Sequence, residues 1–180
     1  MLKVITGFFI AIILVAVVAL TSAQALMFNI TPSPYGVEET AARIQANIQK
    51  PNMKANGWSL SGLRDPGKAV AAAGGNVMPV LLIEACSTQY SGPLLKNDKT
   101  RIFSILMPCT ITVFKNDDGK TYIGTMNAGL MGKLFGVSDI MDKVAADQKH
   151  FLSFDPNEPA PPLIKVQPGG GGGGAAGGGC

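Results

Sequence analysis

The chain has 180 residues, a formal net charge of +3, and a charged fraction of only 15% against 47% of hydrophobic residues. This length suits one domain rather than two. Lysine and arginine are scattered singly along the chain, so the sequence lacks the basic stripe with which proteins bind nucleic acid, and that class of partner is excluded.

A hydrophobic leader opens the chain. Lys3 is the only charged side chain before Glu38, and nearly every residue from Val4 to Leu20 is apolar. Extended through residue 25, such a segment is long enough to cross a bilayer core of about 30 Å as a helix. The positive charge in front of it predicts that the amino terminus stays in the cytoplasm while the rest of the chain crosses the membrane.

Residues 1–25 allow two interpretations. The apolar run is longer than the core of most signal peptides, which favours a permanent signal anchor in the cytoplasmic membrane. Ala23-Gln24-Ala25 has the small-residue pattern of a cleavage site, which favours a signal peptide and a secreted or periplasmic product. Under both interpretations the domain that follows faces the periplasm or the cell exterior.

Residues 26–155 alternate between strand and helix patterns, and we expect them to form one domain. Pro34 and Pro66 each follow a capping residue, which predicts that a helix begins at each of them. The NDDG segment at 116–119 is typical of a hairpin turn, so at least part of the sheet is antiparallel. The expected strands are 26–31, 57–63, 80–83, 102–114 and 121–125, and the expected helices are 34–50, 66–73, 87–97, 127–135 and 138–154.

These elements predict an α+β fold, with a single small mixed or antiparallel sheet packed by helices and preceded by a transmembrane or signal helix. Residues 156–180 are rich in proline and glycine, and we expect a flexible tail there. The tail ends in Cys180, which does not fit a prenylation motif because that motif needs its cysteine four residues from the end.

Four segments carry a resemblance to a known family, namely LLIEAC (81–86), DKTRI (98–102), MPCTITVFKNDDGKTYIGTMN (107–127) and LMGKLF (130–135). In order and spacing they resemble the domain of unknown function 302 family, over roughly Ser33 to Phe154. The resemblance implies a small α/β sandwich that often pairs as a homodimer, so a homo-oligomer is expected, and it implies no established biochemical role. The leader and the glycine-rich tail depart from the family pattern and indicate a membrane-surface setting.

Two of the three cysteines, Cys86 and Cys109, stand at predicted strand ends. They are expected to be separate buried thiols, a disulfide, or soft metal ligands. Met126 closes the return strand of the hairpin and is expected at the same rim of the sheet. A bound cofactor would then be copper or a non-covalent haem held by Cys86, Cys109 and Met126, with the two cysteines as metal ligands. Covalent haem is excluded because the sequence has no C-x-x-C-H motif.

The charged residues suggest a different possibility, a cysteine-dependent enzyme of unknown reaction. Glu84 ends a buried strand close to Cys86, and Arg101 is its expected ion-pair partner. His150 is the only histidine, and its place late on the last predicted helix indicates a surface residue. The sequence has one histidine and no nucleophile elbow, so it offers few of the residue patterns that enzymes use, and no catalytic residue is assigned.

The sequence therefore favours a non-catalytic binding or accessory module exposed on the outer side of the cytoplasmic membrane, within or beside a membrane-associated complex. The alternatives are a soft-metal or haem-binding protein that uses Cys86 and Cys109, and a cysteine-dependent enzyme. The expected partners are the membrane, through residues 4–25, and a second copy of the chain.

Overall fold

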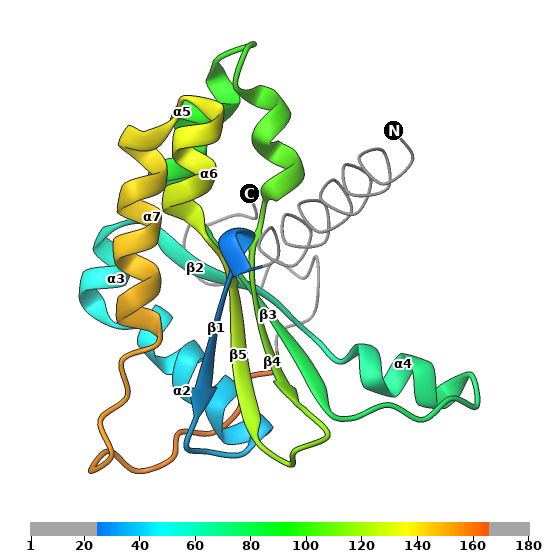
Figure 1. Cartoon of the computed structure of the whole chain (residues 1–180). Helices are drawn as coiled ribbons and strands as arrows, with labels where there is room; N and C mark the ends of the chain where they lie inside the picture. The colour runs from blue at the N-terminus through cyan, green and yellow to red at the C-terminus, as the bar shows by residue number, and fades with distance from the viewer. Residues whose placement is uncertain (1–24, 166–180) are drawn as a thin grey trace, which may run out of the picture.

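The computed structural model describes residues 25–165, which fold around one five-stranded antiparallel sheet in the order β1-β5-β4-β3-β2 (Figure 1). The strands are β1 (Phe28–Ser33), β2 (Trp58–Arg64), β3 (Val80–Ser87), β4 (Cys109–Lys115) and β5 (Thr121–Met126). The helices are α2 (Val37–Ile48), α3 (Pro51–Ala55), α4 (Pro66–Ala72), α5 (Thr88–Lys96), the 3-10 helix η1 (Arg101–Leu106), α6 (Ala128–Phe135) and α7 (Ser138–Phe151).

The predicted leader helix and the glycine-rich end of the tail lie outside the described residues. Within residues 25–165, no helix combines the length and the apolar character needed to span a membrane.

Every neighbouring pair of strands runs antiparallel, so the α+β prediction is confirmed and the sheet is not mixed. β4 and β5 form the predicted hairpin, in which Gly119 supplies the turn with a φ of 78°. β1 pairs with β5, with Phe28 opposite Met126. The two edges of the sheet are therefore β1 and β2.

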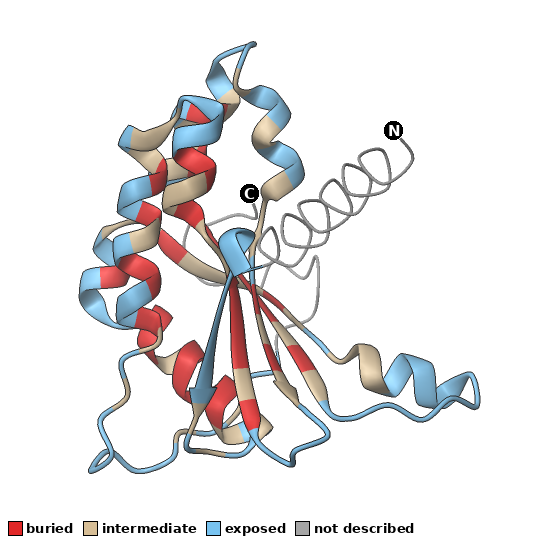
Figure 2. Ribbon diagram, in the orientation of Figure 1, coloured by how far each residue is buried: buried red, intermediate tan, exposed pale blue. Residues whose placement is uncertain are grey.

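One face of the sheet forms the hydrophobic core. Because alternate residues of a strand point to opposite faces, Ile83 and Ile111, which are opposite each other, share the face that packs against Ile44 of α2 and Phe151 of α7. Ile30 of β1 lies on the other face and is half-exposed. The sheet is thus covered by helices mainly on one side, as the distribution of buried residues shows (Figure 2).

The expectation of one extended segment over 102–114 is wrong. Arg101–Leu106 form η1, and β4 begins only at Cys109, after the cis peptide bond between Met107 and Pro108. Proline has no N–H to donate to the ladder, so the regular strand starts beyond it.

The first helix also begins later than predicted, at Val37, because Ser33 is still paired with Thr121 as the last residue of β1. The Ser33 hydroxyl lies 2.7 Å from that of Thr40, inside the helix, instead of capping a helix at Pro34. The capping prediction for Asp65 is confirmed. Asp65 Oδ1 accepts a hydrogen bond from the Lys68 N–H at 2.9 Å, and Asn127 caps α6 in the same way.

Helices α6 and α7 approach each other closely at Gly132. A Cβ added at Gly132 would lie 2.7 Å from the Met141 Cβ and 3.1 Å from the Ser138 Cα. Both atoms belong to or adjoin the backbone of α7, so no side-chain rotation relieves the overlap. Any larger residue at this position has to push the two helices apart.

We expect Gly132→Ala to lower the free energy of unfolding by about 1–3 kcal/mol, because overpacking a close helix contact displaces the backbone. Gly129→Ala in the same helix is the matched control, since its nearest neighbour, Asp142 Oδ1, lies at 3.6 Å. That variant should gain about 0.4–1 kcal/mol from the reduced entropy of the unfolded chain. Denaturant unfolding of both variants measures the difference, and equal effects would contradict the packing argument.

Candidate functional site

The sheet register separates the two candidate cysteines. Cys109 lies opposite Ala85 in the ladder between β3 and β4, and Ala85 faces the core. Cys86 is the next residue of β3, so the alternation of the strand directs it toward the other face. Both residues nevertheless contribute to one pocket, because that pocket lies at the end of the sheet where β3 finishes and β4 begins.

Cys86 is disulfide-bonded and Cys109 is a free thiol, so the two are not joined to each other, and a Cys86–Cys109 disulfide is wrong. Their opposite orientation in the ladder is the physical reason. Burial raises the pKa of the Cys109 thiol to about 11, because an apolar environment disfavours the charged thiolate.

Glu84 pairs with Arg64 and not, as expected, with Arg101. The Arg64 Nε lies 2.7 Å from Glu84 Oε1, across the antiparallel pair of β2 and β3. A register shift between Leu60 and Gly62 places Gly62 opposite Glu84, and a Cβ there would lie only 2.5 Å from Oε2. The glycine therefore makes room for the carboxylate, which is almost completely buried.

Arg101 lies at the start of η1, where its guanidinium contacts the Asp98 carboxylate at 2.8 Å and donates to the Leu95 carbonyl at 3.0 Å. His150 is exposed near the end of α7, as predicted. Arg101 and His150 therefore lie on other elements than Glu84 and Cys86, which share one face of β3. In the part of the chain from 25 to 165, no three His, Cys, Asp or Glu side chains come together as a metal site would require.

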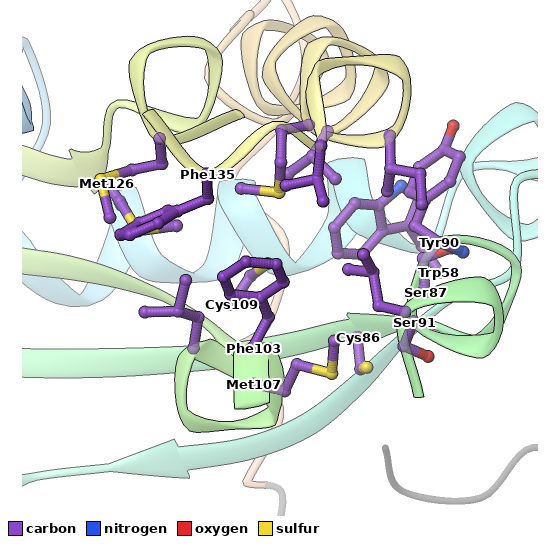
Figure 3. Close-up of a pocket in the computed structure, with 17 residues that line it drawn as sticks. Trp58, Cys86, Ser87, Tyr90, Ser91, Phe103, Met107, Cys109, Met126 and Phe135 are labelled. Atoms are coloured by element: carbon purple, nitrogen blue, oxygen red, sulfur yellow. The ribbon is translucent and has the colours of Figure 1, made fainter. Parts of the chain in front are cut away.

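An apolar pocket of about 50 Å³ lies between the end of the sheet and helices α5, α6 and α7 (Figure 3). Trp58 and Tyr90 stand at one end of it and Met126 at the other. Its lining is unusually rich in sulfur, with six such residues: Cys86, Met107, Cys109, Met126, Met131 and Met141. The pocket thus brings the three predicted ligands to one region, although Figure 3 shows Cys86 and Met126 well apart within it.

The pocket does not fit a haem, since small-molecule sites usually measure about 300–1,000 Å³. Copper(I) prefers thiolate and thioether ligands. Cys86 is engaged in a disulfide and the raised pKa of Cys109 keeps its thiol protonated at neutral pH, which leaves the methionine thioethers as the available soft ligands. A soft-metal site at Cys86, Cys109 and Met126 stays a prediction.

A buried carboxylate, Asp147 of α7, adjoins the same pocket. Trp58 Nε1 donates to Asp147 Oδ2 at 2.7 Å, and the Tyr90 hydroxyl donates to the same oxygen at 2.9 Å. Asn56 Nδ2 lies 3.1 Å from each carboxylate oxygen. Burial first, and then the hydrogen bond to Asp147 and its negative charge, raise the pKa of Tyr90 to about 12. Two of the residues that line the pocket, Trp58 and Tyr90, are thus held in place by one carboxylate.

Sequence reasoning missed this cluster, although two signals were present. Asp147 stands three residues after Val144 and four before Phe151, on the face of α7 that the apolar pattern predicts to be buried. An acidic residue on such a face requires buried donors. Trp58, the only tryptophan of the chain, carries an N–H that needs an acceptor when it is buried.

A second, broader site is a groove of about 620 Å³ along the open face of the sheet. Its lining mixes apolar side chains with threonine hydroxyls and the Arg64–Glu84 ion pair. Six of its lining residues are Phe28, Ile30, Thr110, Thr112, Phe114 and Gly124, and we call this set the sheet groove.

Fold and site together define a small α+β domain in which one antiparallel sheet, covered by helices on one side, carries an open groove and a sulfur-rich pocket at its end. The chain belongs to the family described as domain of unknown function DUF302, whose model matches residues 29–153. This confirms the resemblance seen in the sequence.

The fold also matches the crystal structure of an uncharacterized conserved DUF302 protein from Bacillus stearothermophilus, with a TM-score of 0.60 and 16% sequence identity. The match covers 71% of this chain and 96% of that one, and at this identity it shows the fold alone. No curated protein matches the chain.

We expect Asp147→Ala to lower the free energy of unfolding by about 2–4 kcal/mol, because it leaves the buried Trp58 N–H and the Tyr90 hydroxyl without their acceptor. Asp142→Ala, at an exposed position of the same helix, is the control and should change stability by no more than about 0.5 kcal/mol. Both substitutions exchange the same side chains in α7, so their difference in denaturant unfolding isolates the buried cluster. Similar midpoints would rule out a stabilising role for it.

Proposed function

We propose that this chain is a non-catalytic binding or accessory module held on the outer side of the cytoplasmic membrane, within or beside a membrane-associated complex. The observation that carries the proposal is the sheet groove, a broad concave surface on a sheet face that the described helices leave largely open. An exposed surface of this size with apolar side chains commonly marks a site of interaction.

The side chains of the groove are of the kinds that bind another protein. Phe28 and Ile30 supply apolar area on the edge strand, and Phe114 adds an aromatic ring stacked on Tyr122, with ring centroids 6.0 Å apart. Thr110 supplies a hydroxyl at an exposed position. Apolar and aromatic groups with polar groups around them are the usual composition of protein interfaces.

The state of the polar residues supports a binding role over a cysteine-dependent reaction. The Glu84 carboxylate is bound by Arg64, and the Cys86 sulfur is already in a disulfide. Cys109 carries a protonated thiol at neutral pH, and a thiol must lose its proton to become a nucleophile. The Glu84 charge is thus compensated, and the Cys109 thiol is not in the ionised form that a nucleophile needs.

A second copy of the chain is the partner that we propose for the groove. The groove borders β1, which pairs only with β5 and leaves its outer edge without a strand partner among the described residues. Natural sheets protect such edges, and association of two copies is one way to cover them. A two-fold axis across the groove would bring the same residues of both copies together.

The membrane placement is tested with enzymes fused after residue 180. We expect a phosphatase that is active only after export to be active in this fusion, because Lys3 precedes the apolar leader. A fusion that lacks residues 1–25 is the control and should be inactive. Activity of a reporter that works only in the cytoplasm would place the domain on the inner side and refute the proposal.

We expect Ile30→Arg to weaken self-association on the order of tenfold, because each copy loses apolar contact and adds an unpaired cation at a two-fold interface. Val77→Arg is the matched control, since Val77 is also apolar and half-exposed but lies on the loop before β3, outside the groove. Sedimentation of the full chain in detergent measures both. A monomeric parent chain, or an equal effect of the two substitutions, would contradict the proposed interface.

A further inference from the structure

Exposed apolar side chains from three segments gather at one end of the domain. On η1, Ile102 is 67% exposed and Ile105 is 80% exposed. At the end of α6, Leu134 and Phe135 are exposed, and so are Leu26 and Met27, just before β1. We call these six residues the apolar rim. Large apolar side chains that are exposed together mark an interaction surface more often than isolated ones do.

Contacts connect the three segments that carry the rim. The rings of Phe103 on η1 and Phe135 on α6 lie with their centroids 5.3 Å apart. At the other end of α6, the cap residue Asn127 donates from its side chain to the Leu26 carbonyl at 2.9 Å and from its backbone N–H to the Met27 carbonyl at 2.8 Å. Helix α6 therefore joins η1 to the start of β1.

The position of the rim in the sequence points to its partner. Leu26 follows Leu20, the last residue of the apolar leader, by six positions. An extended chain advances at most about 3.6 Å per residue, so Leu26 lies within roughly 20 Å of the end of that segment. If the leader spans the bilayer, Leu26 and Met27 must stay near the membrane surface, and the end of the domain that carries the rim lies with them.

The charges around the rim fit the same partner. Lys96, Lys99 and Arg101 are exposed on the segment that leads into Ile102, and Lys133 precedes Leu134. Two carboxylates lie nearby in the sequence: Asp98 is paired with Arg101, and Asp139 is exposed at the start of α7. Apolar side chains flanked by cations are typical of surfaces that lie in the lipid interface of membranes with anionic headgroups.

We infer that the apolar rim inserts into the interface of the bilayer that carries the leader, and so holds the domain in one orientation on the membrane. This inference rests on the proposed membrane placement. Helix α4 projects from the end of the sheet away from η1 and the start of β1, and would point into the solvent (Figure 1). The sheet groove would then face along the membrane, toward a second copy anchored in the same bilayer.

The test places a tryptophan at the rim of the full chain, leader included, in vesicles of zwitterionic and anionic phospholipid. Ile105→Trp introduces the probe at a position that is 80% exposed, where η1 borders the groove of about 620 Å³. Val70→Trp on α4 is the control, an exposed apolar position at the far end of the domain. Lipids with brominated acyl chains quench tryptophan that reaches the interface, and the signal of Trp58 is removed by comparison with the parent chain.

We expect the brominated lipids to remove about half of the fluorescence added at position 105, with a blue-shifted emission, and to leave that at position 70 unchanged. Flotation of the same vesicles measures whether the chain is bound to the membrane at all, and so distinguishes a wrong rim from a wrong membrane placement. A chain that floats with the vesicles but shows equal quenching at 105 and 70 would overturn the rim while leaving the membrane anchor in place. A chain that does not float with the vesicles would overturn both proposals.

Discussion

The buried carboxylate of Asp147 is the constraint on which the pocket end of the domain depends. A charge removed from water needs donors, and here they come from Asn56, Trp58 and Tyr90, up to 91 residues away in the sequence. Satisfying one side chain therefore fixes α5 and α7 relative to β2. The Trp58 ring also meets Phe151 edge to face, with centroids 5.0 Å apart, so polar and apolar contacts enforce the same placement.

The two faces of the sheet differ in what covers them. The helix-covered side holds the aliphatic core around Ile44 and Ile83, and the other side is left to the groove. Charged residues near the groove are paired with each other, as Arg64 and Glu84 show. A surface whose charges are already compensated can be covered by a partner with little unpaired charge left behind.

Much of the fold was predictable because its signals are local. The turn at 116–119 and the Asp65 cap depend on residues within a few positions, and the structure confirms them. The partner of Glu84 was not predictable, because it depends on which strand lies beside β3 and on the register shift at Gly62. The Asp147 cluster likewise depends on tertiary placement, and its signal was a single acidic residue on an apolar helix face. Helix and strand boundaries depend on neighbouring residues in the sequence, whereas the geometry of the site depends on which strands and helices lie side by side.

The raised pKa of Cys109 has a consequence for how the chain acquires its covalent structure. With a pKa of about 11, roughly one Cys109 thiol in ten thousand is ionised at pH 7. Thiol–disulfide exchange proceeds through the thiolate, so the folded domain exchanges at this position very slowly. In the folded domain the Cys109 thiol therefore attacks the disulfide at Cys86 only slowly.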